Sequence, residues 1–160
     1  KTSPLSLRAF LRIKFFIYCA PLLVLTEVLI VGTNLLLKAT PFMMALSTVT
    51  VFCLVPGIVA MGIGLGAAYP DFKAENPAQT VTSFGGLVFM IACVVYIGLV
   101  LLLEAGPVYR LFMAGIHGRP LSAALWAWTI ASFGLALALS ILAVVLPLRF
   151  GEKRLAQIHL

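Results

Sequence analysis

The sequence predicts an all-α membrane protein, a polytopic bundle of four transmembrane helices preceded by a short N-terminal interfacial helix. The first observation is composition: 62% of the 160 residues are hydrophobic and 10% are charged, whereas about a quarter of the residues of a soluble domain are charged. The second is the presence of four long apolar stretches, since crossing about 30 Å of hydrocarbon takes roughly 20 apolar residues. Too few polar side chains remain to coat a water-soluble surface.

The spans are placed by the positions of charges and prolines between the apolar stretches. We expect them at about 15–37, 43–68, 84–105 and 122–148, within a single transmembrane region covering residues 1–160. Residues 38–41 form a tight turn, residues 71–80 connect the second span to the third, and residues 106–120 connect the third to the fourth. Because the chain begins with Lys1 rather than methionine, we expect it to be a fragment of a longer polypeptide.

The segment before the first span, "SPLSLRAFLRIKFF", is amphipathic. Its Ser-Pro pair suits the start of a helix, and Arg8 and Arg12 form a cationic stripe beside apolar residues at helical spacing. This pattern favours a short helix lying in the headgroup plane. The alternative is that these residues begin the first span, with arginines that reach to the interface.

The net charge of +6 indicates contact with anionic lipid headgroups rather than with nucleic acid. Four spans place both ends and the middle connection on one side of the membrane. That side carries eight of the 11 cations and the other side carries Lys38, Arg110 and Arg119. The positive-inside bias therefore predicts that both ends of the chain are cytoplasmic. The eight are Lys1, Arg8, Arg12, Lys14, Lys73, Arg149, Lys153 and Arg154.

Glu27 lies near the middle of the first predicted span. A charged acid at that depth costs roughly 2–3 kcal/mol on insertion scales, so we expect it to face the protein interior, to become neutral or to find a cationic partner. One hypothesis is a polar substrate path formed with Asn34. The alternative is a structural hydrogen bond from a neutral carboxyl to Asn34, to a nearby threonine or to another span. Glu104, followed by Gly-Pro, is expected at the membrane interface.

The end of the second span, "GIVAMGIGLGAA", is rich in glycine, and Gly62, Gly64 and Gly66 are predicted to pack closely against other helices. No Gly-Lys-Ser/Thr follows these glycines, so they do not form a nucleotide-phosphate loop. The cysteines and histidines lack metal-ligand spacing, and no catalytic constellation is visible. The sequence therefore predicts no enzyme activity, no cofactor and no metal site.

One polar stretch carries a resemblance to a known family. The segment "GLGAAYPDFKAENPAQTVTSFGG", residues 64–86, resembles a loop of bacterial ABC exporter permeases, in which a glycine-rich span end is followed by a Pro-Asp-Phe turn, Glu-Asn-Pro and a glycine-rich span start. The segment "SPLSLRAFLRIKF" is also similar to that group. The resemblance covers about residues 3–90, and the remaining spans agree only in hydropathy.

The resemblance implies the C-terminal part of a transmembrane permease subunit in the bacterial inner membrane, energised by a separate soluble ATPase. Further spans of the same chain or a second copy would complete it. The residues expected to contact the ATPase are Asp71, Phe72, Lys73, Glu75 and Asn76. The alternative is a non-transporting scaffold or assembly subunit, which the small-residue helix face favours.

Overall fold

In a computed structural model, residues 7–69, 83–117 and 122–158 are described, and they form four long helices. Helix α1 is Leu7–Leu36, α2 is Pro41–Ala68, α4 is Phe84–His117 and α5 is Ala123–Ile158. Each is long and apolar enough to cross a membrane, and the described residues contain no strand. The predicted fold class, a membrane helix bundle, is therefore confirmed.

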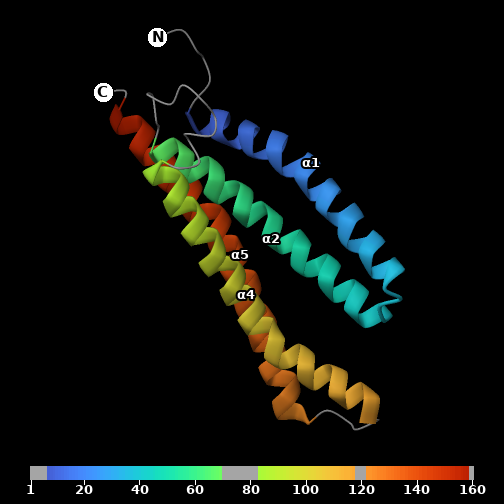
Figure 1. Cartoon of the computed structure of the whole chain (residues 1–160). Coiled ribbons are helices and arrows are strands. Elements are labelled where there is room, and N and C mark those ends of the chain that lie inside the picture. The colour runs from blue at the N-terminus through green and yellow to red at the C-terminus, as the bar shows by residue number, and fades with distance from the viewer. Residues whose placement is uncertain (1–6, 70–82, 118–121, 159–160) are drawn as a thin grey trace.

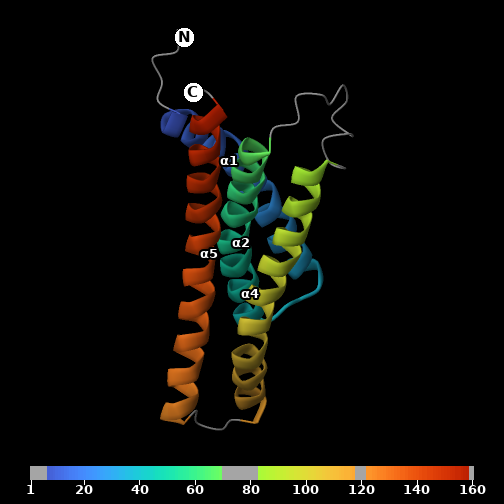
Figure 2. The same ribbon diagram turned by 90° about the vertical axis from the view of Figure 1, so that its left-hand side faces the viewer.

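Helix α2 is the central element of the bundle because it contacts each of the other three helices. Helices α4 and α5 run side by side, and α1 lies on the flank and packs mainly against α2 (Figures 1 and 2). The first turns of α1, the end of α2, the start of α4 and the last turns of α5 lie at one end of the bundle. The α1–α2 turn and the end of α4 lie at the other.

The helices are longer than the predicted spans. At about 1.5 Å per residue, even the 28 residues of α2 measure about 42 Å, and the 36 of α5 about 54 Å, so the ends extend beyond a hydrocarbon layer of about 30 Å. Residues 7–14, in the segment expected to lie along the membrane surface, are the first turns of α1, continuous with the span.

The third span does not end near Gly106. Helix α4 continues to His117 with Pro107 inside it. Ending a helix within lipid leaves several backbone groups unpaired, whereas one internal proline removes a single hydrogen bond. Each of the other helices also contains one internal proline, namely Pro21, Pro56 and Pro147.

The turn between α1 and α2 closes with two capping hydrogen bonds. The Lys38 amide donates to the Leu35 carbonyl at 3.2 Å, and the Ala39 amide donates to the Asn34 carbonyl at 2.9 Å. This pair of bonds defines a Schellman cap, which needs a left-handed residue after the helix. Lys38 takes that role with φ of 50°, a conformation that glycine adopts more readily. Helix α2 begins at Pro41, directly after the turn.

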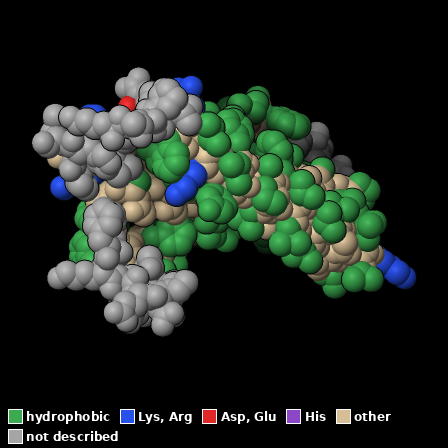
Figure 3. All heavy atoms as spheres, turned by 90° about the horizontal axis from the view of Figure 1, so that it is seen from above, with side chains coloured by type: hydrophobic (Ala, Val, Ile, Leu, Met, Phe, Trp, Pro, Cys, Tyr) green, Lys and Arg blue, Asp and Glu red, His purple; other side chains and the backbone are tan. Residues whose placement is uncertain are grey.

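Large apolar side chains cover much of the outside of the bundle. Leu36 is 86% exposed and Leu102 is 75% exposed. Figure 3 shows apolar side chains along the sides of the molecule, with the visible lysine and arginine side chains gathered toward its ends. A surface of this kind is solvated by lipid chains rather than by water.

The interior consists of two small apolar clusters on either side of α2. One joins α2, α4 and α5 around Met61, Cys93, Tyr96, Val100 and Ala136. The other joins α1 to α2 around Cys19, Val55 and Val59. Cys19, Cys53 and Cys93 are free thiols.

Candidate functional site

The first polar contact inside the bundle joins α2 to α4. Thr50 of α2, only 8% exposed, donates a hydrogen bond of 2.8 Å from Oγ1 to Oε2 of Glu104. Helix α4 continues past Pro107, so Glu104 lies well inside the helix, and its expected position at the membrane interface stays a prediction. Glu104 is also nearly level with Thr50, which lies only about a turn from the midpoint of α2.

The second polar contact joins α2, α4 and α5. It is centred on Tyr96 of α4, which is 4% exposed. Its hydroxyl lies 3.3 Å from the carbonyl oxygen of Cys53 on α2 and 3.0 Å from Oγ of Ser140 on α5. Because a phenol has one hydrogen, it donates to one of these acceptors at a time. Ser140 Oγ in turn donates to the Ala136 carbonyl at 3.0 Å.

Gly57 makes room for Tyr96. A Cβ atom at Gly57 would lie 2.7 Å from the tyrosine hydroxyl oxygen and 2.8 Å from the nearest ring carbons. Thr50, Cys53 and Gly57 are three or four residues apart, so they share one side of α2 over about 10 Å of the helix. We call Thr50, Glu104, Tyr96 and Ser140 the polar line. Its hydrogen bonds join α4 to α2 and to α5.

The two residues predicted to form a polar path, Glu27 and Asn34, lie on α1. Asn34 donates from Nδ2 to Ser47 Oγ at 2.6 Å, and Ser47 Oγ donates to the Met44 carbonyl at 3.0 Å. Glu27 is half-buried on α1, and both of its carboxyl oxygens are buried without a hydrogen-bond partner. The two path residues are seven positions apart on α1, about 10 Å along the helix, and do not meet.

The three glycines predicted to pack against other helices have different surroundings. Gly64 is buried, and a Cβ there would collide with the backbone carbonyl of Pro147 on α5. A Cβ at Gly151 of α5 would lie 2.6 Å from the Gly64 carbonyl oxygen. At Gly62 a Cβ would make ordinary contact with Phe89 at 3.4 Å, and at Gly66 it would meet nothing within 4 Å. Helices α2 and α5 therefore approach most closely at Gly64 and Gly151.

An aromatic cluster lies where α2 ends, α4 begins and α5 ends. The Tyr69 ring packs edge-on against Phe84 at 5.5 Å between centroids and lies 6.5 Å from Phe150. The guanidinium of Arg154 lies over Phe150 at 5.7 Å. The five residues predicted to contact an ATPase follow Tyr69 in the chain and fall outside the described residues. They are Asp71, Phe72, Lys73, Glu75 and Asn76.

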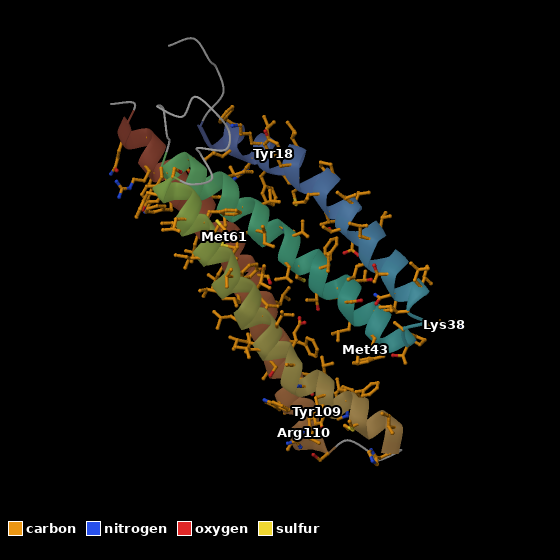
Figure 4. All side chains as sticks on the ribbon, in the orientation of Figure 1. Tyr18, Lys38, Met43, Met61, Tyr109 and Arg110 are labelled. Atoms are coloured by element: carbon orange, nitrogen blue, oxygen red, sulfur yellow. The ribbon has the colours of Figure 1, made fainter. Side chains whose placement is uncertain are left out.

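The other end of the bundle contains an open apolar groove of about 760 Å³ between α2, α4 and α5. Lys38 at the tip of the α1–α2 turn and Tyr109 and Arg110 of α4 lie toward this end (Figure 4). The one hydroxyl in its lining, on Thr129, donates to the Leu125 carbonyl at 2.8 Å, so the groove suits an apolar chain. Its lining is Phe42, Leu111, Trp126, Thr129, Ile130, Phe133, Gly134 and Leu137.

Sequence reasoning missed Gly57, Tyr96 and Gly151 as contact residues. A usable signal was present, because Gly57 and Gly64 are seven residues apart and therefore lie on one side of α2. No group of three or more metal-binding side chains occurs within residues 7–69, 83–117 and 122–158.

A family model described as "Putative ATP-binding cassette" matches residues 1–160, the whole chain. The chain belongs to this ATP-binding cassette family. No curated protein and no solved structure matches it. The family match places this cassette-family chain in the context of ABC transporters. The four long apolar helices support a location in a membrane.

The family assignment corrects the prediction made from the resemblance. The matched family is described as an ATP-binding cassette, not as a transmembrane permease, so the assignment to ABC exporter permeases is wrong. The function that it implied, a permease subunit of an exporter, is contradicted with it, and the scaffold or assembly alternative gains no support. The resemblance rested on one short loop pattern and on hydropathy, which reports the surroundings of a helix but not its task.

Proposed function

We propose that this chain is a membrane-embedded component of an ATP-binding cassette system and that it associates with a separate soluble ATPase. The observation that carries the proposal is that the family match covers the same 160 residues that contain four helices able to cross a membrane. The chain thus combines a cassette assignment with a structure suited to lipid.

We also propose that the chain does not bind or hydrolyse ATP by itself. A phosphate loop presents free backbone N–H groups at the start of a helix and needs a Gly-x-x-x-x-Gly-Lys-Ser/Thr pattern. The sequence has no such pattern, and Gly62 and Gly64 lie inside α2, where their amides are part of the helix. In this proposal the nucleotide chemistry belongs to the partner.

The ATPase is proposed to dock at the end of the bundle that carries Tyr69, Phe84 and Phe150. This end of the bundle has more of the cations than the other end. That excess supports placing it on the cytoplasmic side of a bacterial inner membrane. The residues between α2 and α4 remain the candidates for the contact. Because Tyr69 packs on both α4 and α5, a pull on this connection acts on three helices together.

Inside the membrane, α2 and α5 are proposed to move as one unit. Their backbones meet at Gly64 and Gly151 without intervening side chains, so neither helix can slide without displacing the other. The polar line then links this pair to α4 through Tyr96 and Glu104.

The test uses the purified chain and a candidate soluble ATPase from the same organism. We expect the chain alone to bind no fluorescent ATP analogue, to co-purify with the ATPase and to change its turnover. Reversing charge with Asp71→Lys and Glu75→Lys should reduce co-purification at least tenfold. The matched control, Arg110→Glu at the other end of the bundle, should leave it unchanged. ATP hydrolysis by the chain alone would contradict the proposal, and unchanged binding of the loop variant would exclude these contact residues.

A further inference from the structure

The apolar groove between α2, α4 and α5 has the size and the lining of a site for a hydrocarbon chain. Its volume of about 760 Å³ lies within the range of about 300–1,000 Å³ that small-molecule sites occupy. Its lining side chains remain accessible, since Phe42 is 42% exposed, Trp126 50% and Ile130 67%. The helices therefore do not fill this space themselves, and an exposed apolar groove of this kind marks a site for an apolar molecule.

A bend in α4 forms one wall of the groove. Pro107 lies inside α4 and is fully buried, and a proline within a helix removes a hydrogen bond and kinks the helix. Figure 1 shows the last turns of α4 changing direction beyond this point. Leu111, one turn after Pro107, belongs to this last part and lines the groove together with Phe42 of α2. The bend at the proline thus shapes the space between these two helices.

Helix α5 contributes a continuous stripe of side chains to the groove. Its lining residues recur every three or four positions from Trp126 to Leu137, so they share one side of the helix. The distance from residue 126 to residue 137 along the helix is about 16 Å. One leaflet takes up half of the hydrocarbon core, or about 15 Å. The stripe is therefore about as long as the acyl layer of one leaflet.

Aromatic side chains indicate where the groove meets the membrane surface. Tyr109 of α4 is 61% exposed, and Trp126 and Trp128 at the start of α5 are 50% and 43% exposed. Tryptophan and tyrosine are enriched at the level of the lipid headgroups. Trp128 packs on Gly106, where a Cβ would lie 2.8 Å from its ring, whereas Trp126 lines the groove. The groove therefore begins at the headgroup level and extends toward the bilayer interior.

The charged side chains near the groove are cations. Lys38 precedes Phe42 by four residues, Arg110 directly precedes Leu111, and both cations are exposed. Figure 4 shows Lys38 at the tip of the α1–α2 turn and Arg110 on the last part of α4. The sequence has no acid from residue 28 to 70 or from residue 105 to 151. Long basic side chains extend to the headgroup level, where they attract anionic lipids.

We propose that this groove binds an anionic phospholipid, with an acyl chain along the α5 stripe and the phosphate held by Arg110 and Lys38. A zwitterionic lipid offers the same acyl chains without net charge, so the two cations select between the lipids. The cations also favour a lipid over a further apolar helix, because such a helix offers them no anion. This inference requires no ATPase and is independent of the proposed function.

The test uses the fluorescence of Trp126 in the chain reconstituted in phosphatidylcholine vesicles. Trp128→Phe leaves Trp126 as the only tryptophan, and lipids with brominated acyl chains quench its fluorescence on contact. Dilution series should give brominated phosphatidylglycerol a higher apparent affinity than brominated phosphatidylcholine, by about fivefold for each cation that contacts the phosphate. High salt should reduce this preference, because it screens exposed charges.

Two variants test the two parts of the site. Arg110→Gln removes one cation and should lower the preference for phosphatidylglycerol about fivefold, whereas Arg154→Gln at the other end of the bundle should leave it unchanged. Gly134→Leu places a side chain in the groove and should abolish the preference, since a Cβ at Gly134 meets nothing within 4 Å. Its matched control is Gly115→Leu, at an equally open position of α4 outside the groove lining.

Each negative outcome overturns a stated part of the proposal. Equal quenching by the two lipids in the Trp128→Phe background would overturn the preference for an anionic headgroup. A preference that persists in Gly134→Leu would overturn the groove as the site, and one unchanged in Arg110→Gln would overturn the phosphate contact. Absence of quenching by either lipid would show that protein, such as a second copy, covers Trp126. All variants are compared at wild-type helix content, measured by circular dichroism.

Discussion

Replacing Gly64 by alanine should weaken the bundle, because this glycine lies at the closest approach of α2 and α5. The added Cβ would collide with the Pro147 carbonyl and would lie 2.8 Å from Pro147 Cβ, whereas ordinary contact begins at 3.4 Å. The two helices must therefore separate locally by at least about 0.6 Å. A gap of about 0.5–1 Å forfeits a quarter to a half of the dispersion energy of the atoms that line it.

The expected net effect of Gly64→Ala is a loss of about 1–2 kcal/mol in the free energy of unfolding. Forcing an extra carbon into a packed interface costs about 1–3 kcal/mol. Alanine recovers up to about 1 kcal/mol of that through its higher helix propensity. The matched control is Gly66→Ala, two residues along the same helix, where a Cβ meets nothing within 4 Å. The control should be neutral or more stable than wild type.

Unfolding by sodium dodecyl sulfate in mixed micelles measures this difference. The fluorescence of Trp126 and Trp128, both at the start of α5, follows the loss of tertiary structure, and circular dichroism follows the helix content. The reasoning would be refuted if Gly64→Ala and Gly66→Ala unfolded at the same detergent fraction. That result would mean that α2 and α5 are not in close backbone contact.

Two further substitutions test other contacts with the same unfolding assay. Lys38→Gly should raise the free energy of unfolding by about 1 kcal/mol, because glycine adopts the left-handed backbone at φ of 50° without strain; Lys38→Ala serves as its control, and equal stability of the two variants would contradict the strain argument. Tyr96→Phe should lower the free energy of unfolding by about 0.5–1.5 kcal/mol, since it removes the hydroxyl that bonds to Ser140 or to the Cys53 carbonyl. Unchanged stability of Tyr96→Phe would show that this hydroxyl does not hold the helices together.

The four helices could be predicted because hydropathy and length are properties of each segment alone. Their ends were less predictable. Gly106-Pro107 reads as a helix stop in water, but in lipid the unpaired backbone groups of a helix end cost more than one proline inside the helix. The hydrogen bond between Thr50 and Glu104 was also not predicted, because it depends on how α2 and α4 lie against each other.

The sequence predicted that helices would pack closely, but not which residues would meet. The glycine-rich end of α2 indicated close packing, but the sequence of α2 alone does not show which helix covers Gly64 or Gly66. Only the placement of Pro147 and Gly151 on α5 decides which of the two is covered. In the same way, an acid in an apolar span indicates an interior position, yet the absence of any partner for Glu27 depends on how the helices pack around it.

The short turn at Lys38 also bears on how the chain enters the membrane. Because no more than a few residues separate α1 from α2, the two helices are long enough and close enough to insert together as a hairpin. In the proposed orientation, Lys38 is the one charged residue of the turn between α1 and α2. Inserting these two spans therefore moves a single lysine across the bilayer. The side chains that join the pair, Asn34 and Ser47, would already be bonded during insertion, before α4 and α5 leave the ribosome. The first half of the bundle would thus be assembled during synthesis, and the second half would pack onto it.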